Sequence, residues 1–174
     1  LRRAYPDLPS WPPPRPVAVA DLKEKTWYPK APAGELPPGT DRSLKELLKV
    51  VRPDDVILIK HPGPGELKVD GEELRAAGRV GEAPDLRVTF RPAPGSNPVL
   101  AIEGDDDIDQ TLFKMKGGEV TFEGLQFRLK PKGEQTVAAV AVLGGKSCTF
   151  KSCVFTLAEE DGSKAAAVHL PDLK

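Results

Sequence analysis

Two stretches of this sequence with the same pattern lie 28 residues apart, and that spacing limits the possible folds more than any other feature. "GEVTFEGLQFRL" occupies residues 118–129, and "KSCTFKSCVFTL" occupies residues 146–157. A third copy of the central pattern, "VTFR", occupies residues 88–91. A period in the high twenties with two or three short strands per period is typical of a solenoid, in which each repeat packs only on its neighbours. The repeat therefore predicts successive coils of one parallel β-solenoid.

Alternation along each copy assigns side chains to the inside or the outside, because successive side chains of a strand point to opposite faces. The positions predicted to face the core are Val88, Val120 and Cys148, together with Phe90, Phe122 and Phe150. The intervening Thr89, Thr121 and Thr149 are predicted to face outward. The outward position after each Phe holds Arg91, Glu123 and Lys151 in turn. Stacked about 4.8 Å apart on parallel strands, these charges alternate in sign and attract one another.

The second half of the repeat predicts a bend followed by another strand. Gly124 and Ser152 are the small residues at the bend. The inward positions after it are Leu125, Phe127 and Leu129 in one copy and Cys153, Phe155 and Leu157 in the next. Cys148 and Cys153, the two cysteines of the chain, thus replace apolar residues of the neighbouring coil. We interpret them as core fillers and not as metal ligands, nucleophiles or disulfide partners.

A short amphipathic helix is predicted over residues 43–51. Ser43 and Glu46 form the pattern of a capping box, and Pro53 ends the segment. The apolar stripe of this helix consists of Leu44, Leu47, Leu48 and Val51. We expect the stripe to cover the N-terminal end of the solenoid, because an uncovered end exposes both core side chains and strand edges.

Proline marks the boundary of the expected domain. Ten of the 19 prolines lie in residues 1–40, which we interpret as an extended leader or linker. "WPPPRP" at 11–16 also allows a docking peptide for an aromatic groove. Residues 41–174 form the predicted β-helix domain. Its expected strands are 56–60, 66–69, 86–90, 98–103, 112–116, 119–129, 137–143, 148–157 and 166–170.

The segment "SLKELLKVVRPDDVILIKHPG" at 43–63 resembles the N-terminal part of the pectate-lyase-like right-handed parallel β-helix proteins. These open with a capping helix and an "xPGDxIxL" turn, and here Asp54 stands where that pattern has Gly. "LRVTFRPAPGSNPVLAIEGD" at 86–105 and "GGEVTFEGLQF" at 117–127 resemble the family's coils. The resemblance covers roughly residues 43–172 and implies an all-β, right-handed parallel β-helix of about four to five coils. The fold alone implies no activity, because lyases, hydrolases, adhesins and inert scaffolds share it.

The candidate ligand-binding residues are the outward-facing Lys114, Lys116 and His169. The resemblance implies that lyases of this kind use acidic residues for Ca²⁺ and a basic residue as proton abstractor, whereas the hydrolases use clustered Asp. No pair of carboxylates falls on the same predicted face as these three residues, so the pattern offers no carboxylate acid–base pair.

The acidic stretch "EGDDDIDQ" at 103–110 is the one candidate metal site. Glu103, Asp105, Asp107 and Asp109 alternate and could present oxygens to Ca²⁺. The alternative is a solvated turn whose Asp side chains cap backbone N–H groups, and this is the interpretation we favour because the spacing fits no dedicated Ca²⁺ loop. No other cofactor motif is present.

A net charge of −1 gives no field that would attract nucleic acid, and the longest apolar run, "VAAVAVL", is too short to span a bilayer. We expect a non-catalytic β-helix module that binds carbohydrate or another protein domain within a larger chain. The alternatives are a polysaccharide lyase or glycoside hydrolase fragment and a purely structural spacer. No helix follows the strand at 166–170, so we expect the chain to continue past Lys174 or the edge to pair with another copy or domain. The sequence is compatible with more than one cellular compartment.

Overall fold

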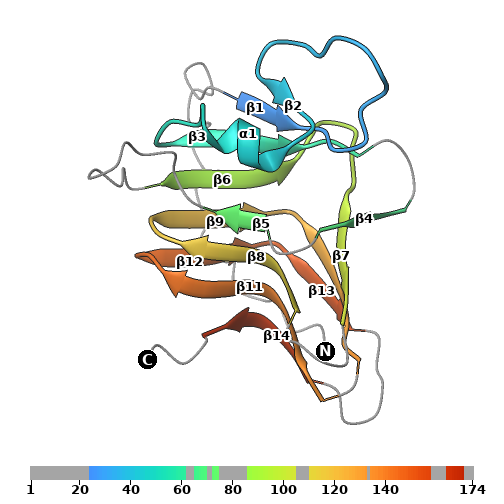
Figure 1. Cartoon of the computed structure of the whole chain (residues 1–174), viewed down its shortest axis with the longest axis vertical. Helices are drawn as coiled ribbons and strands as arrows, with labels where there is room; N and C mark the ends of the chain where they lie inside the picture. The colour runs from blue at the N-terminus through green and yellow to red at the C-terminus, as the bar shows by residue number, and fades with distance from the viewer. Residues whose placement is uncertain are drawn as a thin grey trace, which may run out of the picture.

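The computed structural model describes residues 24–61, 65–69, 72–74, 86–104, 110–132, 134–157 and 164–170. One short helix and fourteen strands occupy these ranges (Figure 1). In chain order they are β1 (Glu24–Trp27), β2 (Thr40–Asp41), α1 (Leu44–Leu48), β3 (Asp55–Ile59), β4 (Glu66–Lys68), β5 (Glu72–Leu74), β6 (Arg87–Pro92), β7 (Val99–Glu103), β8 (Gln110–Lys116), β9 (Glu119–Glu123), β10 (Gln126–Lys130), β11 (Thr136–Gly144), β12 (Ser147–Lys151), β13 (Val154–Leu157) and β14 (Lys164–His169). No helix in the described part of the chain is long and apolar enough to cross a membrane.

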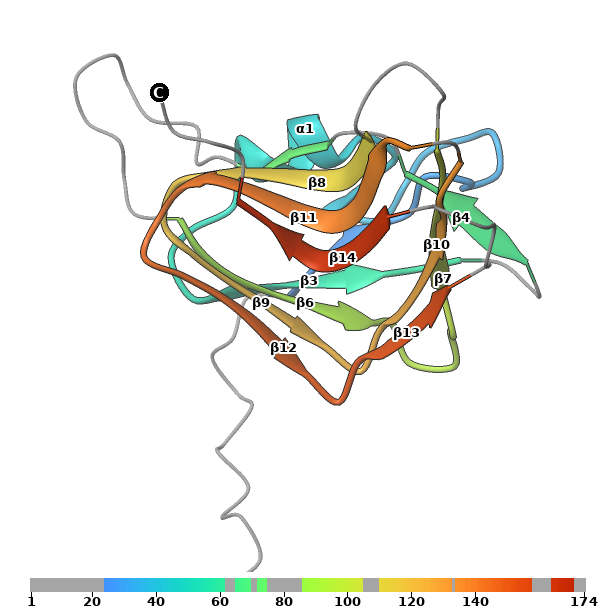
Figure 2. The same cartoon turned by 90° about the horizontal axis from the view of Figure 1, so that it is seen from below.

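The strands form three parallel sheets that wind as a solenoid. The first sheet has the order β12-β9-β6-β3-β1-β2, the second β13-β10-β7-β4, and the third β14-β11-β8-β5. Seen end-on, the sheets form three sides around one core (Figure 2). Over the described residues, β3 to β14 make four coils of three strands each. The prediction of an all-β parallel solenoid is confirmed.

The register between coils follows the sequence repeat. In the first sheet Val88 pairs with Val120, which pairs with Cys148, and the three threonines pair in the same way. In the second sheet Phe127 pairs with Phe155. Equivalent residues of successive repeats therefore lie directly above one another, as the alternation predicts.

Aromatic rings stacked along the solenoid axis fill the core. Phe122 lies between Phe90 and Phe150, with both ring centroids 5.2 Å away and interplanar angles of 19° and 17°. Phe127 and Phe155 form a second stack at 5.0 Å. The two stacks meet edge to face, with Phe122 and Phe127 5.8 Å apart. Such offset and edge-to-face pairs stabilise a core beyond their area of burial.

A left-handed backbone occurs at several turns, among them the two that the sequence analysis singled out. At the bend between the first and second sheets Gly124 has φ 66° and Ser152 has φ 50°. Asp54, which stands where the β-helix pattern has Gly, has φ 68°. Asp is among the few residues that tolerate this region. Its carboxylate also pairs with Arg87 at 2.6 Å, which holds the turn against the next coil.

The helix α1 covers the N-terminal end of the solenoid, as expected, and contacts β1, β2 and β5. Leu44, Leu47 and Leu48 are at most 3% exposed. Ser43 is the N-cap, and its Oγ accepts a hydrogen bond from the Glu46 N–H at 3.3 Å. The reciprocal half of the predicted capping box is missing, because the Ser43 N–H donates to Asp41 Oδ1 and the Glu46 carboxylate binds Lys49.

Strand pairing begins upstream of residue 41, within the stretch that we predicted as an extended leader. The strand β1 pairs in parallel with β3, and β2 pairs with β1. Lys25 of β1 forms an ion pair with the buried Asp55, and Trp27 is 3% exposed. The density of prolines around this segment led us to predict an extended leader. The four residues of β1 include no proline, however, and so are able to form a strand.

The last coil differs from the others in burial. Leu157 was predicted to face the core, yet it is 51% exposed although its register partner Leu129 is 1% exposed. Leu157 has the predicted place in the ladder, but among the described residues no strand lies on the far side of β13 to cover it.

We expect the central Phe stack to carry much of the stability. Replacing the fully buried Phe122 with Ala removes contacts to rings on four other strands and should lower the free energy of unfolding by about 3–5 kcal/mol. Urea titration measures this loss. The half-buried Phe155 at the end of its stack provides the matched variant Phe155→Ala, which should cost clearly less. Equal losses at both positions would contradict the role of the stack.

Candidate functional site

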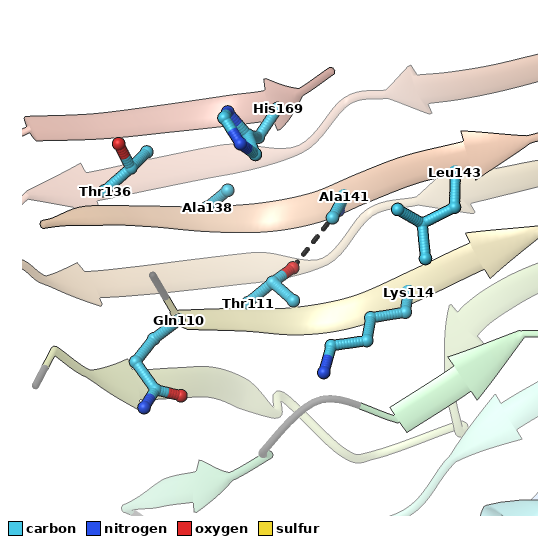
Figure 3. Close-up of a pocket in the computed structure, with 8 residues that line it drawn as sticks. All are labelled: Gln110, Thr111, Lys114, Thr136, Ala138, Ala141, Leu143 and His169. Carbon is cyan, nitrogen blue, oxygen red and sulfur yellow. Dashed lines mark hydrogen bonds between the residues drawn. The ribbon is translucent and has the colours of Figure 1, made fainter. Parts of the chain in front are cut away.

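A groove lies on the outer face of the third sheet. It encloses about 200 Å³. Its lining residues come from β8, β11 and β14 and are Gln110, Thr111, Lys114, Thr136, Ala138, Ala141, Leu143 and His169 (Figure 3). Alanine forms the floor of the groove, and the longer polar side chains stand around it.

Strand register explains why the groove exists. Lys114, Ala141 and His169 pair across three neighbouring strands and form one column. Because adjacent strands are about 4.8 Å apart, the backbones of Lys114 and His169 are about 9.6 Å apart, with only a methyl group between them. A second column consists of Thr111, Ala138 and Ala166. Small side chains on the middle strand thus leave a hollow between longer ones.

Thr111 shapes the floor of the groove. Thr111 is 7% exposed. Its hydroxyl donates to the Phe113 carbonyl at 2.9 Å and accepts from the Ala141 N–H at 3.1 Å. Leu112 and Phe113 are consecutive and both lie in the core, so β8 departs from strict alternation here. The hydroxyl satisfies backbone groups at this irregularity, which makes Thr111 a structural residue of the groove.

Leu143 forms an apolar wall of the groove, beside a β-bulge. The register of β11 against β8 shifts between Val142 and Gly144, so two residues of β11 oppose Lys116. Bulges re-aim side chains and are common beside functional sites. Leu143 is 37% exposed and lines the groove, whereas the other large apolar residues of β11 lie inside the solenoid.

The structure brings together two of the three predicted ligand-binding residues. Lys114 and His169 line the groove, whereas Lys116 lies farther along β8, outside it. Sequence reasoning did not select Gln110 and Thr136, because each stands at the first position of a strand whose start was placed one or two residues later. Leu143 was recognised as outward-facing, but the neighbouring bulge in β11 has no clear signal in the sequence.

The predicted Ca²⁺ ligands are only partly described. Glu103 lies at the end of β7 on an outer face, and its carboxylate is 3.7 Å from Lys68 Nζ. Asp105, Asp107 and Asp109 lie outside the described residues. Among the residues that the structure does describe, no three His, Cys, Asp or Glu side chains gather as a metal site.

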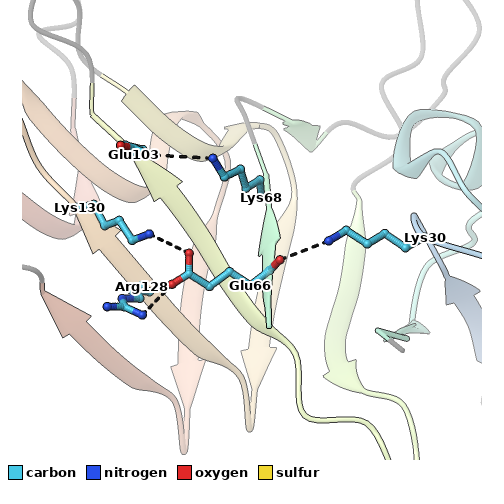
Figure 4. Close-up of polar contacts among 6 residues, drawn as sticks. All are labelled: Lys30, Glu66, Lys68, Glu103, Arg128 and Lys130. Carbon is cyan, nitrogen blue, oxygen red and sulfur yellow. Dashed lines mark hydrogen bonds and ion pairs between the residues drawn. The ribbon is translucent and has the colours of Figure 1, made fainter. Parts of the chain in front are cut away.

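A second polar cluster occupies the outer face of the second sheet (Figure 4). The carboxylate of Glu66 on β4 accepts from Arg128 at 2.7 Å and from Lys130 at 2.9 Å, both on β10. It therefore reaches across the intervening strand β7. The residue of β7 that pairs with Arg128 is Ala101, which faces outward and is only 2% exposed. A small residue at this position lets the long side chains close over it.

The electrostatics of this cluster favour the ionised carboxylate. The hydrogen bond from Lys130, followed by the charges of Lys130 and Arg128, holds the pKa of Glu66 below its ordinary value. Glu66, Arg128 and Lys130 already have oppositely charged partners in one another. This cluster therefore stabilises the stacking of three coils and offers little free bonding capacity to a ligand.

The two cysteines pack against the core, as predicted. Burial raises the pKa of the Cys148 thiol to about 11, so it stays protonated at neutral pH and is a poor nucleophile. Cys153 Sγ donates to the Phe122 carbonyl at 3.3 Å. Both thiols are free.

Comparison of the chain with protein-family profiles, with curated protein sequences and with solved structures finds no match in any of the three. The interpretation of the groove therefore depends on its own geometry and chemistry.

The Glu66 cluster predicts a stability difference that depends on pH. A carboxylate whose pKa is lowered by folding stabilises the native state above its unfolded pKa, and this contribution is lost as the pH falls through the folded pKa. We expect Glu66→Gln to lower the free energy of unfolding by about 1 kcal/mol at neutral pH and by progressively less as the pH falls through the lowered pKa of Glu66 in the folded protein.

Urea titrations of both proteins from neutral pH to the acidic end of the stable range measure this difference. Glu46→Gln is the matched control, since Glu46 pairs with Lys49 on the exposed surface of α1 and should contribute less. A loss of stability in Glu66→Gln that does not change with pH would contradict the lowered pKa of Glu66.

Proposed function

We propose that this chain is a non-catalytic β-helix module that binds carbohydrate in the groove of the third sheet. The observation that carries the proposal is the column in which Lys114 and His169 flank Ala141. A concave site of this kind, mainly apolar with a few polar groups at fixed positions, is typical of small-ligand sites.

The groove matches the amphipathic chemistry of a sugar ring. A pyranose has an apolar C–H face, which can lie on Ala138, Ala141 and Leu143. Its hydroxyls would then reach the polar side chains of the rim, among them Gln110, Lys114, Thr136 and His169. Lys donates, Gln and His both donate and accept, and Thr does both through one hydroxyl, so the rim suits hydroxyls in either role.

The proposed relationship is with the pectate-lyase-like β-helix proteins. Its support is the parallel solenoid with a helix at its N-terminal end, and the left-handed Asp54 at the position where that family's pattern has Gly. A non-catalytic role is favoured because the described lining of the groove includes no carboxylate that would act as acid or base.

Binding to an oligosaccharide array, followed by calorimetry on the best ligand, tests the proposal. Lys114→Ala and His169→Ala should each weaken binding about tenfold, since a lost hydrogen bond with a charged or polar partner costs about 1–2 kcal/mol. Lys116→Ala is the matched control on the same strand and should leave the affinity unchanged.

Two results would replace the proposal with one of its rivals. Unsaturated product formed from a uronic-acid polymer in the presence of Ca²⁺ would show a lyase, in which Asp109, next to Gln110 in the sequence, becomes a residue to test. Absence of binding to any glycan of the array would favour a structural spacer or a module that binds protein.

A further inference from the structure

Three neighbouring strands of the third sheet carry basic residues and no acidic ones. The strands β8, β11 and β14 contain Lys114, Lys116, Lys164 and His169, and none of their residues is Asp or Glu. The whole chain has 25 basic and 26 acidic residues, so this bias is local. The second sheet lacks it, because cations on its outer face pair with carboxylates. The outer face of the third sheet therefore favours an anionic ligand.

The groove brings two of these basic residues to one place. Lys114 and His169 stand on either side of Ala141, and both line the groove (Figure 3). The one hydrogen bond drawn among the lining residues joins Thr111 to Ala141, so it engages neither basic side chain. The described lining of the groove contains no carboxylate. Both basic side chains can therefore turn to a ligand that enters.

The apolar floor strengthens the attraction of these residues for a negative charge. Ala138 and Ala141 are 1% and 6% exposed, and Leu143 extends the apolar surface. Water screens charges at a protein surface, and a cleft with apolar walls contains less of it, so the field inside the cleft is stronger. An oxyanion above Ala141 would accept hydrogen bonds from Lys114 on one side and from His169 on the other.

His169 makes this attraction depend on pH, because histidine ordinarily changes its charge between about pH 5 and pH 8. Among the described strands β14 pairs with β11 alone, and the residues of β11 that line the groove are all uncharged: Thr136, Ala138, Ala141 and Leu143. The other charged residues on the described strands of this sheet are Lys114 and Lys116 on β8, Lys164 on β14, and Glu72 and Glu73 on β5. Two strands separate β5 from β14. The strand next to His169 thus supplies no carboxylate to neutralise the imidazolium.

We propose that the groove prefers glycans that carry a carboxylate or a sulfate, and that His169 makes it bind them more tightly at acidic than at alkaline pH. This preference rests on the carbohydrate binding proposed above for the same groove. A protonated His169 adds a second positive charge beside Lys114 and donates a charge-assisted hydrogen bond to the oxyanion. The neutral imidazole still forms a hydrogen bond but contributes no charge. The contribution of His169 is therefore present at low pH and is lost as the pH rises.

An array of neutral, uronic-acid and sulfated oligosaccharides tests the proposal at about pH 5.5 and about pH 8, near the two ends of the range in which histidine titrates. Carboxylate and sulfate groups are ionised at both values, so a change in affinity reports on the protein. We expect acidic glycans to bind about tenfold more tightly at the lower pH, since a hydrogen bond loses its charge at the higher one. Neutral glycans should bind equally at both. The two acidic classes distinguish a carboxylate from a sulfate as the bound group.

Variants separate the roles of the two basic residues. His169→Gln keeps a neutral hydrogen-bonding side chain, so it should remove the pH dependence and leave the affinity near that of the unmodified protein at the higher pH. Lys114→Gln should weaken the binding of acidic glycans at both pH values and keep the pH dependence. Lys151→Gln is the matched control, because it removes one lysine charge from the first sheet and should change neither property.

Calorimetry at neutral pH, in buffers that differ in ionisation enthalpy, gives a second readout. Binding that favours the imidazolium draws protons from solution, so the strongest acidic glycan of the array should bind with proton uptake. The uptake should vanish in His169→Gln. The second histidine of the chain, His61, follows β3 of the first sheet, and proton uptake that remains in His169→Gln would point to it instead.

The outcomes distinguish the pH-dependent preference from carbohydrate binding itself. Acidic glycans that bind equally at both pH values, a preference for neutral glycans, or a pH dependence that persists in folded His169→Gln would each overturn the preference while carbohydrate binding stands. Absence of binding to every glycan of the array at both pH values would overturn carbohydrate binding and the preference together.

Discussion

Hydrogen-bonded register between successive coils is the constraint on which the rest of this structure depends. Once a strand pairs in parallel with its equivalent one coil earlier, every side chain lies directly on its counterpart at the spacing of the strands. Phe122 then necessarily lies between Phe90 and Phe150. A shift of one residue would move these rings to the solvent face, so the buried stack and the ladder hold each other in place.

The same register determines the chemistry of the outer faces. On the third sheet it places Ala141 between Lys114 and His169 and so produces a groove. On the second sheet the register pairs Ala101 with Arg128, and the small Ala101 side chain lets Glu66 reach over it to Arg128. The result is a closed ion-pair cluster. A small residue on the middle strand therefore has a different effect on each sheet. On the second sheet the flanking side chains bind each other over it, whereas on the third sheet they stand apart and leave a hollow.

Predictions that rest on the repeat agree with the structure, whereas predictions from local composition agree less well. The strands β9, β10, β12 and β13 lie where the aligned copies place them. The strands β1 and β2 were missed because segments of four and two residues carry little pattern. Tertiary contacts place them instead: β1 pairs with β3 and buries Trp27, and β2 pairs with β1. The capping box formed only in part because the Ser43 N–H donates to Asp41 Oδ1 and the Glu46 carboxylate binds Lys49 instead.

The sequence by itself determined the solenoid, its inward and outward positions, the helix at its N-terminal end and the outward placement of Lys114 and His169. These follow from a period and an alternation, which neighbouring residues already express. Only the tertiary structure decided that Lys114 and His169 share one groove while Lys116 does not, that β11 bulges beside Leu143, and that Glu66 reaches Arg128 across β7. These depend on small register shifts and on side-chain reach between strands about 27 to 62 positions apart, for which a single sequence carries no local signal.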